Sequence, residues 1–238
     1  MKNVLVTGGS GAIGSAICKE LASLGFFVGV HYNKNREKAE ALAKEIGGIA
    51  VGFDIKDAEQ VKNGVEYFVK KAGGICALIN NAGIAQTIKP LLDTSEQEFD
   101  EVFSVNIKGV FLASKAVIPH MLEKGGNIVN ISSMWGLVGA SCESVYSASK
   151  GAVNSFTKAL AKEYASAKIK VNAIAGGFID TPMNAILSDD DKNLCLGDIP
   201  LGRFGRPEDV AKLVAYLCSE NCFMTGEVIN LSGGEVII

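Results

Sequence analysis

Tyr146, Lys150 and Ser133 are the residues of this chain whose types and spacing best suit chemistry on a carbonyl group. Because Tyr146 and Lys150 are four positions apart, a helix would place both polar ends on one face. A free tyrosine has a pKa of about 10, and an adjacent ammonium would lower that pKa toward neutral. The pair therefore predicts proton exchange with the oxygen of a ketone or alcohol, although Tyr and Lys also meet by chance on many helices.

Seven short apolar runs predict the strands that would position these residues. The runs show no polar alternation, which is typical of strands buried on both faces of a sheet. They are 4–7, 27–32, 49–53, 76–80, 127–131, 169–174 and 228–231. Expected helices fall between them at 13–24, 34–46, 57–72, 96–122, 145–166 and 207–219. This alternation predicts a single α/β domain, 1–238, with a doubly wound parallel sheet of about seven strands and helices on both faces, the Rossmann fold.

Local signals support two helix starts and mark one unusual segment. Asp57 with Gln60, and Ser95 with Glu98, have the spacing of a capping box. The segment 181–206 is instead rich in Asp, Asn, Gly and Pro. We expect it to form a mobile flap over the ligand crevice, which in this fold class lies beyond the carboxyl ends of the strands.

The composition argues against several classes of partner. A net charge of −3 and the lack of a Lys/Arg run argue against a nucleic-acid surface. The N-terminal segment becomes glycine-rich after three apolar residues, so we expect neither a signal peptide nor a membrane span, and a cytoplasmic protein. Six cysteines are scattered and the only histidines are His31 and His120, which predicts reduced thiols and no metal site. Small molecules or copies of the same chain are the expected partners.

A glycine-rich turn follows the first expected strand and opens the first expected helix. Gly9, Gly11 and Gly14 have the spacing of a dinucleotide-binding turn. Glycines there let backbone N–H groups approach a pyrophosphate at the positive end of the helix. A purely structural glycine turn is the alternative, but the strand–turn–helix context favours a dinucleotide.

The end of the second expected strand bears on which dinucleotide binds. An acidic residue about 20 positions past the glycines would accept a hydrogen bond from a ribose 2′-OH and repel a 2′-phosphate. This chain has Asn33, Lys34 and Arg36 in that region instead. Lys34 and Arg36 could neutralise a 2′-phosphate, so we expect NADPH, with NADH as the alternative.

The order of these motifs resembles the short-chain dehydrogenase/reductase family, and the resemblance covers nearly the whole chain. The matching motifs are the Thr-Gly-rich first turn, Asn80-Asn81-Ala82-Gly83, Asn106, Ser133, Tyr146 and Lys150. The resemblance implies that Tyr146 donates a proton to a carbonyl oxygen held by Ser133. It also implies that Lys150 binds the nicotinamide ribose and lowers the pKa of Tyr146, and that Asn106 supports a water relay to Lys150.

The same resemblance implies a set of cofactor-binding residues. Asp54 would contact adenine, Asn80 would lie beneath the cofactor and Thr181 would anchor the carboxamide. The full set is Gly8, Ser10, Gly11, Ile13, Gly14, Asn33, Lys34, Asp54, Ile55, Asn80, Ala82, Gly83, Tyr146, Lys150, Ile179 and Thr181. Asp54 and Thr181 have an alternative interpretation as strand-end or turn caps.

Two positions depart from the family pattern. Ala12 stands where a glycine is usual, and its methyl group is tolerable if its φ stays negative. Gly176 stands where a proline is common, which predicts a looser hinge for the flap.

Within the family, the chain looks most like the 3-oxoacyl-[acyl-carrier-protein] reductases, so reduction of a 3-oxoacyl thioester is the leading hypothesis. Those enzymes dock an acidic carrier protein on basic residues near the site. Lys124 occupies one such position, while Ala167 replaces the other beside Lys168, which predicts weaker docking. One alternative is an NAD(P)-dependent dehydrogenase of a small alcohol, sugar or steroid. Another is a dinucleotide-binding regulator without catalysis, which the intact catalytic residues argue against.

Two further expectations concern surfaces. Trp135, Cys142 and Met183 would line the entrance and suit an acyl chain, or would belong to the core. The expected helices 96–122 and 145–166 carry more apolar surface than one sheet face can cover. In the family these helices build a tetramer, and we expect one here.

Overall fold

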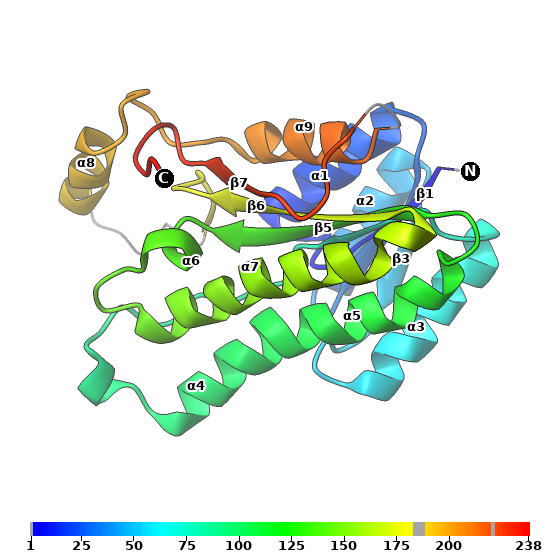
Figure 1. Ribbon diagram of the computed structural model, residues 1–238, viewed down its shortest axis with the longest axis horizontal. Coiled ribbons are helices and arrows are strands. Elements are labelled where there is room, and N and C mark those ends of the chain that lie inside the picture. Colours follow the sequence, from blue (N-terminus) through cyan, green and yellow to red (C-terminus); the bar gives the residue numbers. More distant parts are fainter. Residues whose placement is uncertain (1, 183–188, 220–221) are drawn as a thin grey trace.

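The computed structural model describes residues 2–182, 189–219 and 222–238. Seven strands form one parallel sheet in the order β3-β2-β1-β4-β5-β6-β7 (Figure 1). The strands are β1 (Asn3–Val6), β2 (Phe27–Tyr32), β3 (Ile49–Gly52), β4 (Ala77–Asn80), β5 (Gly126–Ser133), β6 (Ile169–Gly176) and β7 (Val228–Leu231). The predicted doubly wound fold is thus confirmed, and all seven expected strands are present within one or two residues of their expected bounds.

Helices cover both faces of the sheet. They are α1 (Ala12–Ser23), α2 (Arg36–Ile46), α3 (Ala58–Ala72), α4 (Glu96–Phe103), α5 (Gly109–Val117), α6 (Trp135–Val138), α7 (Ser144–Tyr164), α8 (Asp189–Gly197) and α9 (Pro207–Leu217). Helices α1, α2 and α9 pack on one face, and α3, α5 and α7 on the other (Figure 1). Each face therefore has its own hydrophobic core, which explains why the strands read as unbroken apolar runs.

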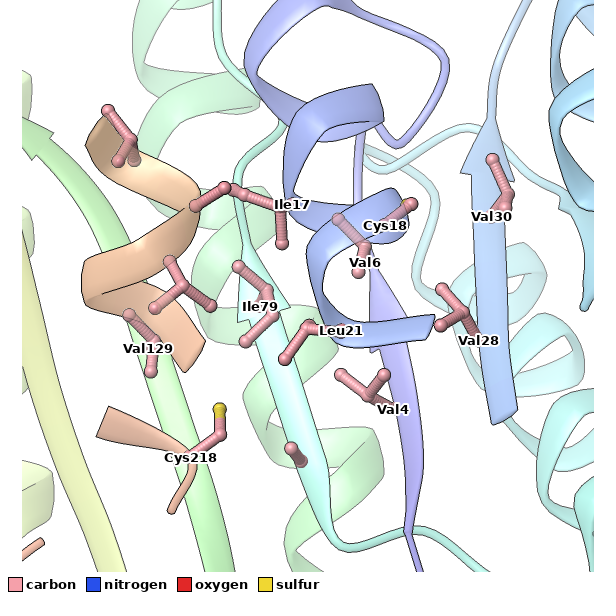
Figure 2. Close-up of a cluster of buried hydrophobic side chains, with 14 of the residues drawn as sticks. Val4, Val6, Ile17, Cys18, Leu21, Val28, Val30, Ile79, Val129 and Cys218 are labelled. Carbon is pink, nitrogen blue, oxygen red and sulfur yellow. The ribbon is translucent and has the colours of Figure 1, made fainter. Parts of the chain in front are cut away.

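The alternation of side chains along β1 shows how one strand serves both cores. Val4 and Val6 point to the core under α1, whereas Leu5 between them points to the opposite core, as the two-residue period of a strand requires. Figure 2 shows Val4 next to Leu21, and Val6 next to Cys18, both residues of α1. All four are fully buried, so truncating Leu21 to Ala would cost about 2–5 kcal/mol of stability.

The predicted helix starts are present with one change of partner. Ser95 and Glu98 form the reciprocal capping box of α4. Asp57 caps α3 by accepting hydrogen bonds from the backbone N–H groups of Glu59 and Gln60. Gln60, however, accepts a hydrogen bond from the backbone N–H of Asp54, so its side-chain oxygen braces the loop before the helix.

The expected helix 96–122 is observed as a continuous helical stretch with a local change of winding. Between α4 and α5, Ser104–Lys108 forms a π-helical turn, and Ile118–His120 ends the stretch as a 3₁₀ turn. By length and composition alone, Glu96–His120 is apolar enough to cross a membrane, a test that a core helix of a soluble protein also passes. Its inner side packs on the α3-side core.

Two α-helices of the described residues were not predicted. Short α6 follows β5 directly, and α8 lies inside the expected flap 181–206. The flap prediction covers residues 183–188, which lie outside the described residues, so its mobility stays a prediction.

Candidate active site

The sheet reverses its winding between β1 and β4, and the loops after these two strands meet there. Asn81 donates side-chain hydrogen bonds to the carbonyl oxygens of Thr7 (3.0 Å) and Gly8 (3.1 Å). In return, Thr7 Oγ1 accepts the backbone N–H groups of Asn81 and Ala82. This junction fixes the first turn against the fourth strand at the point where ligands bind in doubly wound sheets. Asn81 and Thr7 were not among the predicted site residues, although both lie inside motifs that were recognised.

The predicted glycine turn has the shape that a pyrophosphate requires. Gly8 has a φ of +62°, and a Cβ on Gly14 would lie 2.2 Å from the carbonyl oxygen of Gly8. The N-cap residue of α1 is Gly11, which has no side chain to cap the helix, so the first N–H groups of α1 remain available at the positive helix end. Ala12 is not among the residues with positive φ, which confirms that its methyl group is tolerated. The turn therefore fits a dinucleotide phosphate group.

A buried histidine is hydrogen-bonded to the backbone of this turn. His31 Nδ1 accepts a 2.8 Å hydrogen bond from the backbone N–H of Gly8, so Nε2 carries the proton and donates to the carbonyl oxygen of Phe53 at 3.0 Å. Burial lowers the pKa of His31 to about 4, which keeps the ring neutral. Sequence reasoning considered His31 only as a metal ligand, and its adjacency to the cofactor turn comes from the β1–β2 pairing.

Residues expected at the adenine end lie beyond β2 and β3. Asn33 and Lys34 are exposed. Arg36 is held by Glu40 at 2.7 Å, whereas Lys34 has no ion pair among the described residues. Asp54 Oδ1 accepts the backbone N–H of Lys56. Of the two cations predicted to face a 2′-phosphate, Arg36 is therefore paired with a carboxylate and Lys34 is not, among the described residues.

Asn80 lies in a buried polar network. Its side-chain nitrogen donates to Asn130 Oδ1 (2.8 Å) and Ser114 Oγ (3.1 Å), and Asn130 donates in turn to Thr157 Oγ1 (2.8 Å). The network joins β4, β5, α5 and α7. The Asn80 amide is thus buried in the interior and does not line the pocket.

Asn106 occupies the π-helical turn and is almost completely buried. Its side chain exchanges hydrogen bonds with the backbone of Ile84 (2.9 and 3.0 Å) and donates to Ser149 Oγ (3.1 Å). A Cβ on Gly83 would meet Asn106 Oδ1 at 3.3 Å and Lys150 Nζ at 3.5 Å. The structure therefore brings Asn106, Gly83 and Lys150 together as expected. The water relay stays a prediction, because both polar atoms of the Asn106 amide already have protein partners.

Ser133, Tyr146 and Lys150 meet on one wall of a pocket. Ser133 ends β5, while Tyr146 and Lys150 lie on consecutive turns of α7. Lys150 Nζ donates to the carbonyl oxygen of Ile131 at 3.0 Å and lies 5.6 Å from the centroid of the Tyr146 ring. The side chains that line the rest of this pocket are mostly apolar, among them Ile84, Trp135 and Phe178. This matches the composition of small-molecule sites, which are apolar with a few convergent polar groups.

The pKa values of Tyr146 and Lys150 differ from the sequence-based expectation. Burial raises the pKa of Tyr146 to about 12, a hydrogen bond with Ser133 opposes that rise, and the charge of Glu143 adds to it. Burial also lowers the pKa of Lys150 to about 8. The expected lowering of the Tyr146 pKa by Lys150 is therefore not what the protein alone produces, because desolvation of the phenol is the largest contribution and raises the pKa.

Gln86 holds the start of the catalytic helix, and sequence reasoning missed it. Its side-chain oxygen accepts the backbone N–H groups of Val145 (3.0 Å) and Tyr146 (3.1 Å). These are the second and third residues of α7, whose N-cap residue, Glu143, makes no side-chain capping hydrogen bond. A residue from the loop after β4 thus supplies the hydrogen bonds that a local cap normally supplies.

The segment after β6 closes the other side of the pocket. Ile179 is buried and pairs with Gly205 in a parallel bridge, and both Ile179 and Thr181 line the pocket. Trp135 lines it as predicted and meets Phe178 edge-on at 6.0 Å. Cys142 is absent from this lining, so its predicted place at the entrance is not supported, and Met183 lies outside the described residues.

Lys124, at one of the predicted carrier-docking positions, and Lys168, beside the other, lie away from this pocket. Lys168 precedes β6 and Lys124 lies just before β5, whereas Ser133 and Gly176 end the same two strands at the pocket. Seven steps at about 3.3 Å each separate the two ends by about 23 Å. Within one chain, the expectation that these lysines lie near the site is therefore wrong.

Comparisons with known proteins identify the family to which this arrangement belongs. A family model described as enoyl-(acyl carrier protein) reductase matches residues 8–235. The chain belongs to the short-chain dehydrogenase/reductase family. Family membership makes it an oxidoreductase that uses a nicotinamide dinucleotide.

Similar proteins match over nearly their full lengths. The 3-oxoacyl-[acyl-carrier-protein] reductase of Thermotoga maritima is 40% identical over 243 residues, covering 99% of this chain and 98% of that protein. The enzyme of the same name from Aquifex aeolicus is 41% identical over 238 residues, with 97% and 95% covered. The crystal structure of a dehydrogenase/reductase from Sinorhizobium meliloti superposes with a TM-score of 0.91 at 38% identity, covering 98% of this chain and 94% of that one.

Proposed function

We propose that the chain reduces the ketone of a 3-oxoacyl thioester to a secondary alcohol with NADPH, as a reductase of the 3-oxoacyl-[acyl-carrier-protein] type. The supporting observation is the meeting of Ser133, Tyr146 and Lys150 in an apolar pocket beside the glycine turn. The names of the relatives point to the same reaction.

The protein groups can each be given a role. Ser133 Oγ accepts the backbone N–H of Trp135 at 3.2 Å, and its O–H, which is hydrogen-bonded to Tyr146, would turn to donate to a carbonyl oxygen that enters between the two hydroxyls. A nicotinamide held beside these residues would supply the hydride for the carbonyl carbon. Tyr146, kept protonated by its raised pKa, donates its proton to the oxygen as that atom gains negative charge. Lys150 then stabilises the phenolate until it is protonated again.

The choice of NADPH rests on Lys34. It is exposed without an ion pair among the described residues, and no acid takes the place that would favour a 2′-OH. NADH is the alternative cofactor, and the test compares the two directly.

The experiment follows oxidation of NADPH and of NADH with acetoacetyl-N-acetylcysteamine, a soluble 3-oxoacyl thioester. We expect turnover with a preference for NADPH, and a loss of two or more decades in Tyr146→Phe, the range of general acid catalysis. Crotonyl-N-acetylcysteamine serves as the enoyl substrate that the family description suggests, and simple alcohols and sugars with NAD(P)⁺ test the dehydrogenase alternative. Tight NADPH binding without any turnover would favour a regulator instead.

The proposal includes a cytoplasmic homotetramer that receives its substrate on an acyl carrier protein. Exposed Phe99 (44%) and Phe111 (43%) on α4 and α5 support self-association through these helices. Lys124 and Lys168 are the candidate carrier contacts, and their distance from the pocket of their own chain means that they would serve a carrier bound at another subunit. Light scattering of the purified protein tests the tetramer, and substitution of both lysines by Glu tests carrier docking.

A further inference from the structure

The active-site pocket contains one acidic side chain that the proposed mechanism does not use. Among the described residues that line it, Glu143, Tyr146 and Lys150 are the titratable ones, and Glu143 is the only carboxylate. It stands immediately before α7, three positions ahead of Tyr146. The remaining lining is mainly apolar, so a single carboxylate there has a large effect on what can enter.

Glu143 has no structural task that would account for its position. It occupies the N-cap position of α7, yet its side chain makes no capping hydrogen bond, because Gln86 already accepts the N–H groups of Val145 and Tyr146. No hydrogen bond or ion pair to the Glu143 side chain occurs among the described residues. The nearby cation, Lys150, directs its Nζ to the carbonyl oxygen of Ile131.

A half-buried carboxylate without a partner carries a free-energy cost unless it meets a ligand. Burial raises its pKa above the ordinary value for Glu, and its charge acts on Tyr146 strongly enough to contribute to the raised pKa of that phenol. Glu143 lines the same pocket as Ser133 and Tyr146 and stands at the N-cap of the helix that carries Tyr146, so its carboxylate faces the space that a substrate next to these residues would fill.

We propose that Glu143 is a specificity-determining residue that admits substrates bearing a neutral group or a hydrogen-bond donor next to the reacting ketone and excludes those bearing a carboxylate or phosphate there. The inference rests on the proposed ketone reduction. According to this inference, the pocket accepts esters, thioesters or amides of 3-oxo acids, in which the acid group carries no charge. The free acids would be repelled by the Glu143 carboxylate.

A matched substrate pair tests this selection. Acetoacetyl-N-acetylcysteamine and acetoacetate carry the same ketone, but only acetoacetate has a negative charge two carbons away. The ratio of their kcat/KM values in one enzyme preparation cancels effects of folding, cofactor binding and Tyr146. Where acetoacetate turns over too slowly, its inhibition constant against the thioester replaces kcat/KM.

We expect Glu143→Gln to lower the thioester preference by at least about fivefold, the effect of removing one partly screened charge contact. Glu163→Gln, which makes the same change in charge at the exposed far end of α7, should leave the ratio unchanged. In the unsubstituted enzyme the preference should also fall as the pH is lowered and Glu143 becomes protonated, whereas Glu143→Gln should show no such change. Titration of Lys150 and Tyr146 changes kcat/KM by the same factor for both substrates, so it cancels in the ratio of the two kcat/KM values.

An unchanged ratio in Glu143→Gln, with an active parent enzyme, would overturn the role of Glu143 and leave the proposed function standing. If the parent enzyme reduced neither substrate with either cofactor, the proposed function itself would fail, and the selection with it.

Discussion

The side-chain oxygen of Gln86 accepts a hydrogen bond from the backbone N–H of Tyr146 at 3.1 Å. The loop that carries Gln86 begins at Asn81, which is bonded to the backbone of the first glycine turn. One short loop, 81–86, therefore contacts both the cofactor turn and the helix that carries the proton donor. The position of Tyr146 relative to the cofactor turn depends on this loop as much as on α7 itself.

Replacing Gln86 by Ala should weaken catalysis and stability together. Two N–H groups at the start of α7 would lose their acceptor, which costs about 1–2 kcal/mol for a helix cap. We expect a lower thermal midpoint and a fall in kcat with little change in the KM for NADPH, measured by thermal unfolding and steady-state kinetics. Gln97→Ala, at an exposed position on α4, is the control. Equal kcat in both variants would contradict the assigned role.

Replacing His31 by Ala should loosen the phosphate-binding turn. The Gly8 N–H and the Phe53 carbonyl would both lose their partner, at about 1–3 kcal/mol for each buried group left unpaired. NADPH titrations should show weaker binding, while His120→Ala, whose ring contacts Glu66 near the surface, should bind normally.

His31 also predicts a pH dependence of stability. Its pKa is lowered from 6.5 to about 4 in the folded protein, so the unfolded chain takes up a proton first as the pH falls. The contribution of His31 is therefore complete above pH 6.5 and is lost as the pH falls toward 4. Denaturant unfolding should show the stability difference between the parent protein and His31→Ala shrinking over this window. A constant difference would mean that the ring is not buried as a neutral group.

Lys150 predicts a pH dependence of stability in the alkaline range. Its pKa is lowered from 10.5 to about 8, so between these values the unfolded chain holds a proton that the folded chain has released. The free energy of unfolding of the parent protein, relative to Lys150→Met, should rise as the pH increases from about 8 to 10. Lys162→Met, exposed on the same helix, should show no such trend. Taking the difference removes the contributions of Cys18 and Cys218, whose raised pKa values act in the same range.

Replacing Lys34 by Ala should change the preference between cofactors. An exposed cation facing a phosphate contributes roughly 1 kcal/mol, so the KM for NADPH should rise about three- to tenfold, and the effect should shrink in high salt. The KM for NADH should stay the same. Lys62→Ala on α3 provides a control for the loss of one surface charge, and a parallel rise in both KM values would show that Lys34 does not contact the 2′-phosphate.

The strands and most helices could be predicted because each was encoded locally. Leu5 between Val4 and Val6 leaves no polar face, so the run could only be a strand buried on both sides. Helix α8 was missed because its Asp and Asn residues and terminal glycine are those of a loop. The π-helical turn around Asn106 was missed because its side chain is bonded to the backbone of Ile84, which lies in the loop after β4 and is distant in the sequence.

The site was predictable to the extent that its residues lie in recognisable motifs. Ser133, Tyr146, Lys150, Ile13, Gly83, Ile179 and Thr181 were named from the sequence and do line one pocket. Gln86 and His31 were missed because their roles come from hydrogen bonds between segments far apart in the chain. Asn80 was placed beneath the cofactor by resemblance, and the structure adds that its amide bonds to Asn130 and Ser114.

The chain of hydrogen bonds from Asn80 through Asn130 to Thr157 limits how α7 can sit on the sheet. Apolar contacts alone have no direction, and a helix resting on Val and Ile side chains can rotate or slide with modest loss of energy. Thr157 must face Asn130 or leave buried polar atoms unmatched, which is costly in a dry interior. The rotational setting of α7 about its own axis, and with it the direction in which the phenol emerges, is thereby tied to two amides in the middle of the sheet.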